Sequence, residues 1–220
     1  MRRILSVGLL LFTTNLAFSQ CPVIFDFFGN TSTNPEWFHC QNSPYTLNIQ
    51  SPNTINDYTI DWGDGSPVET GGPLVPPNSG PHNYALAVDV YTILITDNTT
   101  GCTTTGTLTM EEATSASIQI PVGGLTQACA PQAMEFINSS TNVSPNTNFT
   151  WHFGDGSAPL NFDYTNLGDT ITHTYQPNTV DCETTVTLIA ENVCNTLQGG
   201  PSTATFNPVS YTHLTLPTKA

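Results

Sequence analysis

The chain has 220 residues and a formal net charge of −14, because 17 acidic residues face only three basic ones. All three basic residues lie in residues 1–19 or 209–220. Residues 20–208 therefore contain no Lys or Arg, and their formal charges are all negative. A surface of this charge repels nucleic acid and anionic membranes, which excludes both as expected partners. Divalent cations would relieve the self-repulsion, so calcium is the one cofactor to consider; otherwise none is expected.

Residues 1–19 have the pattern of a secretory signal peptide. Arg2 and Arg3 precede an apolar run at residues 4–12 that is too short to span a bilayer. Residues 17–19 fit a small-x-small cleavage site, and no later segment is apolar enough to cross a membrane. We therefore expect a secreted or cell-surface protein whose mature chain does not insert into the membrane.

The other end of the chain has a different character. Residues 209–220 read Val-Ser-Tyr-Thr-His-Leu-Thr-Leu-Pro-Thr-Lys-Ala, and translating a transposon-type sequencing adapter gives the first ten of them. We expect this segment to be adapter read-through rather than native protein. The natural sequence after residue 208 would then be a different one.

Between these ends the chain shows short alternating apolar runs separated by turn residues, and no convincing amphipathic helix. The linker at residues 111–114 is too short to allow free movement between two halves. Loops are expected at 30–38 and 71–81. The predicted strands are 22–28, 44–50, 57–62, 90–96 and 103–110 in the first half, and 116–121, 132–137, 148–153, 184–191 and 202–206 in the second.

Two of these strands run into nearly identical turns. The first is Trp62-Gly63-Asp64-Gly65 and the second is Trp151-His152-Phe153-Gly154-Asp155-Gly156. Glycine on both sides of an aspartate allows positive φ where the chain reverses, and the aspartate can accept hydrogen bonds from the turn N–H groups. The tryptophan before each turn is a large apolar side chain that a small sandwich would bury.

The similarity extends beyond the turns. In each half a His-x-Tyr begins 19 residues after the first turn glycine, His82 to Tyr84 and His173 to Tyr175. A strand-like run and a cysteine come next in both halves. These features define an internal repeat of about ninety residues, the size of one immunoglobulin-like (Ig-like) sandwich.

The repeated motif resembles that of the PKD (polycystic-kidney-disease) family of Ig-like domains. The second copy matches the aromatic-strand, Gly-Asp-Gly and His-x-Tyr pattern closely, whereas the first copy reads as lacking a residue pair between Trp and Gly. The resemblance implies an all-β chain with two tandem sandwiches, at residues 20–112 and 113–208, of the kind exported by Bacteroidetes. Its structural signature is Trp62, Gly63, Asp64, Gly65, His82, Tyr84, Trp151, Gly154, Asp155, Gly156, His173 and Tyr175.

The roles of these residues are expected to be structural. His82 and His173 occupy equivalent positions, which favours an imidazole bonded to loop backbone over a catalytic base. Tyr84 and Tyr175 should act as tyrosine corners, with the hydroxyl bonded to backbone. Asp64 and Asp155 are expected to lock their turns. With Asp61 they are also weak candidates for calcium ligands, although the spacing does not fit an EF-hand.

Six cysteines after a signal peptide indicate disulfides, and the absence of any C-x-x-C argues against zinc. In an Ig-like sandwich the second and sixth strands run in the same direction. Cys40 and Cys102 would then lie about 20 Å apart at ~3.3 Å per residue, beyond the ~7 Å that a disulfide allows. Matching strand ends instead pairs Cys129 with Cys182, and also Cys21 with Cys102. Cys40 and Cys194 would remain to join the two domains.

No nucleophile elbow, P-loop or H-E-x-x-H occurs, so the sequence predicts no enzyme. The resemblance implies an extracellular spacer, adhesion or protein–protein interaction segment of a larger protein. The alternative is a set of accessory modules, calcium-dependent and carbohydrate-binding, of a truncated secreted hydrolase. Trp37 and Phe38, expected in a loop, could serve such sugar binding, although core packing is favoured. The expected partner is therefore an extracellular protein or glycan.

Overall fold

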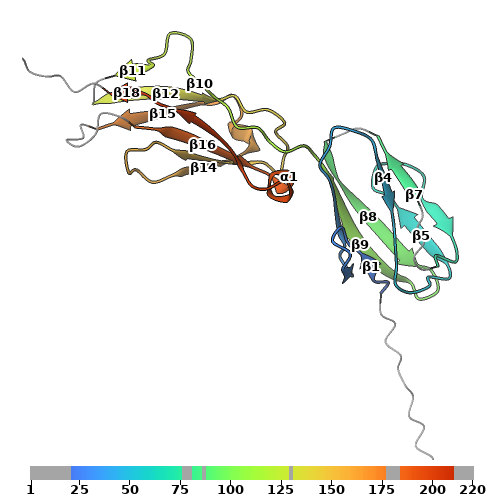
Figure 1. Cartoon of the computed structure of the whole chain (residues 1–220). Coiled ribbons are helices and arrows are strands. Elements are labelled where there is room, and N and C mark those ends of the chain that lie inside the picture. The colour runs from blue at the N-terminus through green and yellow to red at the C-terminus, as the bar shows by residue number, and fades with distance from the viewer. Residues whose placement is uncertain (1–20, 76–80, 86–87, 129–130, 177–183, 211–220) are drawn as a thin grey trace, which may run out of the picture.

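The computed structural model describes residues 21–75, 81–85, 88–128, 131–176 and 184–210. Figure 1 shows two β-sandwiches joined end to end, each with its own buried hydrophobic core. The predicted signal peptide lies outside the described residues, as do Cys129, Cys182 and residues 211–220.

The first sandwich packs a five-stranded sheet on a two-stranded one. Among the described strands of this sandwich only the β3–β9 pair is parallel, and a hairpin, β1–β2, precedes β3. Leu47 and Tyr84 from the small sheet meet Ile60, Ile93 and Ile95 from the large sheet in the core. The sheets have the orders β3(Glu36–His39)-β9(Cys102–Met110)-β8(Asp89–Asp97)-β5(Tyr58–Asp61)-β6(Glu69–Gly71) and β4(Tyr45–Asn48)-β7(Pro81–Tyr84), and the hairpin is β1(Ile24–Phe25) with β2(Thr31–Ser32).

Strand β8 shows why these sequences form sheets. Ile93 and Ile95 are fully buried, while Thr92 and Leu94, which alternate with them, point to the exposed face. Branched residues favour extended backbone, and a period of two separates the buried face from the exposed one. The same alternation in β9 allows the two strands to pair over their full length, Asp89 opposite Met110 through Asp97 opposite Cys102.

The second sandwich packs a three-stranded sheet on a four-stranded one. Phe136 from the smaller sheet meets Phe149, Trp151 and Leu188 from the larger one in the core. Its elements are β10(Ile118–Gln119)-β12(Gln132–Asn138)-β15(Thr170–Tyr175) and β14(Leu160–Asp163)-β13(Asn148–His152)-β16(Val186–Glu191)-β17(Ser202–Phe206), a parallel pair of β11(Gln127–Ala128) with β18(Val209–Ser210), a 3₁₀ turn η1(Tyr164–Asn166) and a one-turn helix α1(Val193–Leu197).

The predicted all-β, Ig-like fold is confirmed, and several predicted boundaries are wrong. The first strand is only Ile24–Phe25, and the segment 30–38, expected to be a loop, contains β2 and β3. Strand β3 was missed because it is short and begins directly after Pro35, yet it buries Trp37 to 4% exposure. Helix α1 was not predicted either. Its five residues are too few to show a helical period, and only its N-cap, Asn192, signals it.

Strand β18 includes the first two residues of the segment that we expect to be non-native. Val209 and Ser210 pair with Gln127 and Ala128. The pairing involves two backbone positions on each strand and leaves the origin of residues 209–220 as a prediction.

Candidate functional site

Each sandwich contains a turn cluster, defined here as the Gly-Asp-Gly turn with the aromatic residue before it and the His and Tyr of the His-x-Tyr. In the first turn cluster Gly63 and Gly65 have φ of 75° and 80°. Asp64 Oδ1 accepts a hydrogen bond from the backbone N–H of Ser66 at 3.0 Å. These glycines therefore reverse the chain while the aspartate holds the turn.

His82 connects this turn to the core. Its Nε2 lies 2.8 Å from Asp64 Oδ2, and its ring stacks on Trp62 with centroids 4.5 Å apart. The hydroxyl of Tyr84 donates to the backbone carbonyl of Trp62 at 2.8 Å. The histidine was expected to bond to loop backbone, and that prediction is wrong: the partner of its Nε2 is the turn aspartate, because β7, which carries His82 in the facing sheet, brings the ring to the turn.

The second turn cluster repeats this geometry. His173 Nε2 lies 2.7 Å from Asp155 Oδ2, and the His173 ring stacks on Phe153 at 3.9 Å. The Tyr175 hydroxyl donates to the carbonyl of Phe153 at 3.2 Å. Both tyrosine hydroxyls thus bond to backbone, as the tyrosine-corner expectation states.

The two clusters correct the alignment of the motif. Trp62 and Phe153 have the same neighbours, so they are the equivalent aromatic residues. The residue equivalent to Trp151 is Ile60, since Ile60 lies opposite Ile95 and Trp151 lies opposite Leu188 in the corresponding strand pairs. The first copy therefore lacks no residues. It carries Trp at the position of Phe153 and Ile at the position of Trp151.

Hydrogen bonding shifts the pKa of both aspartates. Partial burial raises the pKa of Asp64, but the bonds from Ser66 and His82 outweigh burial and lower it to about 2. The same opposing causes, with bonds from Ser157 and His173, leave the pKa of Asp155 lowered. Burial raises the pKa of Tyr84, and it raises that of Tyr175 to about 12.

The calcium candidates have partners within the protein. Asp64 uses one carboxylate oxygen for Ser66 and the other for His82, and Asp61 Oδ1 accepts from the N–H of Gly63. Within the described ranges, no group of three or more His, Cys, Asp or Glu side chains is placed to hold a metal ion. A calcium ion at either turn would compete with the histidine for Oδ2 of the aspartate.

The aromatic residues near the N-terminus divide into buried and exposed ones. Trp37 is buried, and its Nε1 donates to the carbonyl of Phe25 at 3.1 Å. Phe27 and Phe28 are 47% and 65% exposed and, with Phe38, form an edge-to-face group with centroids 5.3–6.4 Å apart. The exposed aromatic surface therefore consists of phenylalanines, and Trp37 is core.

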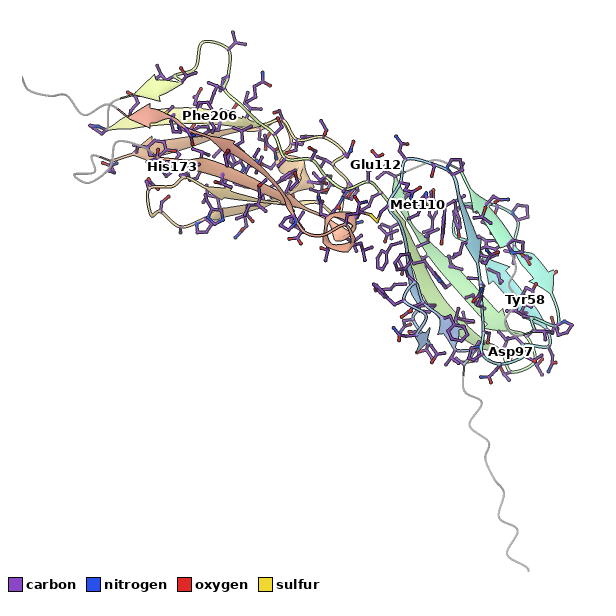
Figure 2. All side chains as sticks on the ribbon, in the orientation of Figure 1. Tyr58, Asp97, Met110, Glu112, His173 and Phe206 are labelled. Atoms are coloured by element: carbon purple, nitrogen blue, oxygen red, sulfur yellow. A yellow bond between two sulfur atoms is a disulfide. The ribbon has the colours of Figure 1, made fainter. Side chains whose placement is uncertain are left out.

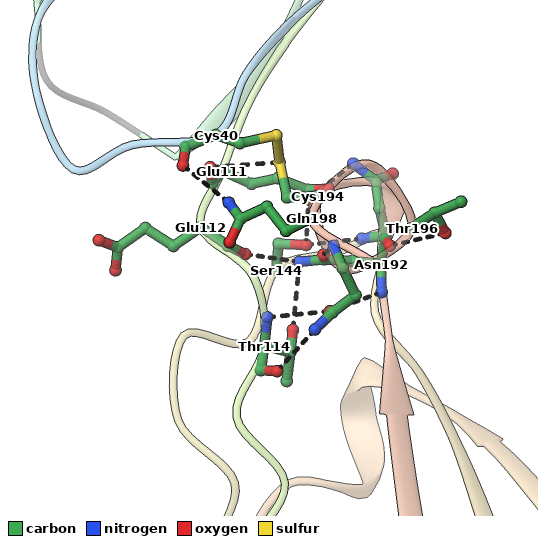
Figure 3. Close-up of a disulfide and its surroundings, with 11 residues drawn as sticks. Cys40, Glu111, Glu112, Thr114, Ser144, Asn192, Cys194, Thr196 and Gln198 are labelled. Carbon is green, nitrogen blue, oxygen red and sulfur yellow. Dashed lines mark hydrogen bonds between the residues drawn. A yellow bond between two sulfur atoms is a disulfide. The ribbon is translucent and has the colours of Figure 1, made fainter. Parts of the chain in front are cut away.

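The elbow, defined as residues 111–114, helix α1 and Cys40, joins the two sandwiches. Figure 2 shows Met110 and Glu112 at this junction, and Figure 3 shows the disulfide between Cys40 of the first sandwich and Cys194 of α1. Their Cα atoms are 5.4 Å apart. Cys21 also pairs with Cys102, at 5.0 Å, so two of the three predicted disulfides are present; the third lies outside the described residues.

Buried amides fix the linker to α1. Asn195 accepts from the N–H of Thr114 at 3.0 Å and donates to its carbonyl at 2.9 Å, as a neighbouring strand would. Asn192 donates to the carbonyl of Glu112 at 2.7 Å while also capping α1. On the other side, Gln198 donates to the carbonyl of Cys40, and the N–H of Glu111 donates to the carbonyl of His39. The two Asn195 bonds are buried and therefore costly to break, whereas the Gln198 bond is exposed. The elbow is thus held by side chains as well as by the disulfide.

Sequence reasoning found the cysteine of the elbow but missed its asparagines. The missed signal is the spacing of Asn192 and Asn195, which allows a reciprocal cap at the first turn of a helix. Glu111 of the linker is also buried, and its Oε2 accepts from Ser144 at 2.5 Å and from Asn146 at 3.3 Å.

No helix in the described part of the chain is long and apolar enough to cross a membrane. No protein-family model matches the chain, and neither does any curated protein. Solved structures of Ig-domain proteins do match. The N-terminal four Ig domains of Dscam1 isoform 4.44 are 14% identical, with a TM-score of 0.44 over 87% of this chain and 46% of that one.

Two further matches are similar in extent. The CD2-binding domain of CD58 is 9% identical, with a TM-score of 0.42 over 78% of this chain and 95% of that one. Murine CEACAM1b is 13% identical, with a TM-score of 0.40 over 80% of this chain and 96% of that one. These values are low, and the chain spans about half the length of the Dscam1 fragment. The Ig-like assignment therefore comes from this chain's own strand order and cores.

Proposed function

We propose that the chain is a non-catalytic, extracellular pair of PKD-type sandwiches of a Bacteroidetes-like protein. It would serve as a spacer, adhesion or protein–protein interaction segment of a larger secreted or cell-surface protein. The proposed units are residues 20–112 and 113–208, after a signal peptide at 1–19. The expected partner is an extracellular protein.

The elbow is the observation that supports a spacer best. A disulfide connects the two sandwiches, and the side-chain amides of Asn192 and Asn195 bond the linker of four residues to α1. A spacer must present its neighbouring domain at a fixed distance and direction, and this joint supplies both. Disulfides between distant segments also favour an oxidising, extracellular compartment.

The repeated histidines support a role without catalysis. Each imidazole stacks on an aromatic ring and bonds to the turn aspartate through Nε2. These contacts give the histidine a structural role, in which it fixes the turn to the core. A general base needs a proton acceptor that can reach a substrate. In both turn clusters Nε2 is already bonded to the turn aspartate, and one face of the ring is covered by an aromatic side chain.

Small-angle scattering of the oxidised chain tests the spacer. We expect one bent, elongated shape whose profile does not change with salt, because the elbow holds one angle. A profile that requires many interdomain angles would contradict the proposal. The variant Asn195→Ala, which keeps the disulfide, shows how much of the rigidity comes from the amide bonds.

The exposed phenylalanine group favours a second candidate, a carbohydrate-binding accessory module of a secreted hydrolase. Aromatic faces exposed to solvent can stack on sugars, and the ring of Phe28 is more exposed than that of Phe27. Glycan-array binding that Phe28→Ala abolishes would support this candidate. Replacing Trp37 would not test it, because that side chain packs in the core. Loss of binding with EDTA would show a calcium requirement.

A further inference from the structure

The two disulfides connect segments in an order that changes how the chain can be stretched. Cys21 bonds to Cys102, 81 positions later, and Cys40 bonds to Cys194, 154 positions later. The Cys21–Cys102 disulfide closes a loop within the first sandwich. The other disulfide joins Cys40, a residue of that loop, to Cys194 in the second sandwich. Once noncovalent contacts fail, the shortest covalent route carries the tension, so the two disulfides together decide which residues bear it.

The shortest route from Cys21 to Cys194 avoids nearly all of both sandwiches. It runs along the 19 positions from Cys21 to Cys40 and then crosses the elbow disulfide. Without that disulfide the route would pass through Cys102 and the 92 positions from there to Cys194. Residues 41–193 are therefore outside the shortest route in the oxidised chain.

The native fold already takes up much of the short route. Cys21 lies beside Cys102 at the start of β9, and His39 lies opposite Met110 at the end of β9. The distance from Cys21 to Cys40 is thus close to the length of β9, about 27 Å at ~3.4 Å per residue. Nineteen residues reach at most about 68 Å when fully extended. Stretching this route can add only about 40 Å, whichever noncovalent contacts fail.

We propose that the elbow disulfide makes this pair of sandwiches a covalently limited, load-bearing link. Under tension between its ends, the segments that extend are the short one from Cys21 to Cys40 and the final strand after Cys194. The sheets and cores from residue 41 to residue 193 are held outside the loaded route. This inference deepens the spacer part of the proposed function and says nothing of what the spacer binds.

This arrangement predicts different consequences for the two disulfides. Removing the elbow bond opens the 92-position route and lengthens the fully stretched chain by about 260 Å. If Cys129 and Cys182 are also bonded, that route shortens to 39 positions and the gain falls to about 70 Å. Removing the Cys21–Cys102 bond leaves the 19-position route unchanged, so the maximum extension stays the same.

Single-molecule stretching of the mature chain, with handles at its two ends, tests this directly. The variants are the elbow pair Cys40→Ser with Cys194→Ser, and the matched control pair Cys21→Ser with Cys102→Ser. Contour length at high force depends on the covalent route alone, so a variant that folds poorly still gives a result. We expect the elbow pair to lengthen by either of the two stated values and the control to match the unmodified chain.

Two outcomes would overturn the proposal: an elbow variant no longer than the unmodified chain, or a control that lengthens as much as the elbow variant. Neither outcome depends on a ligand or on the angle between the sandwiches. A failure here therefore remains distinguishable from a failure of the scattering or glycan-binding experiments.

Discussion

The two turn clusters have one plan, built from different aromatic residues. In the first, Trp62 supports His82 with ring centroids 4.5 Å apart; in the second, Phe153 supports His173 at 3.9 Å. The large indole of the second sandwich lies two positions earlier, at Trp151, in the centre of the core. The aspartate, the histidine and the tyrosine keep their partners in both copies. The polar bonds of the cluster therefore tolerate a change of ring beneath them.

The difference shows which residues of the motif are required for their geometry and which are required only to fill volume. The histidine must reach the aspartate, the tyrosine hydroxyl must reach a backbone carbonyl, and the glycines must adopt positive φ, which together permit little variation. The aromatic positions must fill space, and Trp with Ile in one copy fills it as Trp with Phe does in the other. Distorting the backbone of the turn should therefore cost more than exchanging the rings.

The largest effect is expected at the first glycine of each turn. A Cβ at Gly63 would lie 2.2 Å from the carbonyl oxygen of Thr92, and one at Gly154 would lie 2.5 Å from that of Thr185. Both residues also have positive φ. Replacing either with Ala should destabilise its own sandwich by about 3 kcal/mol or more, since both strain and a backbone clash result. Hydrogen exchange, read separately for peptides of each sandwich, measures this.

The second glycine of the turn is the control. Gly65 has φ of 80°, but a Cβ there meets no atom within 4 Å. Gly65→Ala should cost only about 1 kcal/mol, which is the cost of a left-handed conformation alone. Equal losses at Gly63 and Gly65 would show that the clash with Thr92 contributes nothing.

Acid should weaken both sandwiches through their turn aspartates. The pKa of Asp64 is about 2 in the folded chain, below the ~3.9 of an unfolded aspartate. Its contribution is thus complete above pH ~4 and is lost as the pH falls toward 2. Asp64→Asn should flatten the pH dependence of stability in that window for the first sandwich only. Urea unfolding at several pH values, with Asp155→Asn as the reciprocal variant, tests this; an unchanged pH dependence in both would refute it.

The sequence predicted those parts of the fold that depend on local patterns. Alternation at Ile93 and Ile95 located β8, and the duplicated Gly-Asp-Gly with its His-x-Tyr located the repeat. The strand-end argument also paired Cys21 with Cys102 and left Cys40 and Cys194 to join the two domains. Such features are readable because neighbours in the sequence, or the direction of a strand, determine them.

The contacts that the sequence did not predict join distant segments. His82 bonds to a side chain 18 positions away, and Asn195 bonds to Thr114, 81 positions away. Neither of these hydrogen bonds can be predicted from a local sequence pattern. The equivalence of Ile60 with Trp151 was hidden because the more similar letters, Trp and Trp, suggested a deletion. Strand pairing corrected it, since a shift of two residues keeps a side chain on the same face.

Exchanging the rings should have moderate and unequal effects. Trp151 donates from Nε1 to Asn166 Oδ1 at 3.2 Å within the core, so Trp151→Phe loses a buried bond as well as volume. We expect a cost of about 2 kcal/mol. Trp62→Phe places in the first cluster the ring that the second already uses, and should cost about 1 kcal/mol. Domain-resolved hydrogen exchange distinguishes them, and a larger loss at Trp62 would contradict the proposed equivalence with Phe153.

The smallest effect is expected from the tyrosine hydroxyls. The Tyr84 hydroxyl lies 2.8 Å from the carbonyl oxygen of Trp62, whereas that of Tyr175 lies 3.2 Å from that of Phe153. Removing either should cost about 1 kcal/mol, with the larger loss at the shorter bond.

The dependence of stability on alkaline pH reports on the burial of the tyrosine hydroxyls. Burial raises both tyrosine pKa values above that of an unfolded tyrosine, which is about 10. Each hydroxyl therefore stabilises the fold below pH ~10, and its contribution is lost as the pH rises toward the folded value. Tyr84→Phe should remove that loss for the first sandwich, leaving a variant less stable at pH 7 but less sensitive to base. A variant that keeps the full alkaline loss would show that another group causes it.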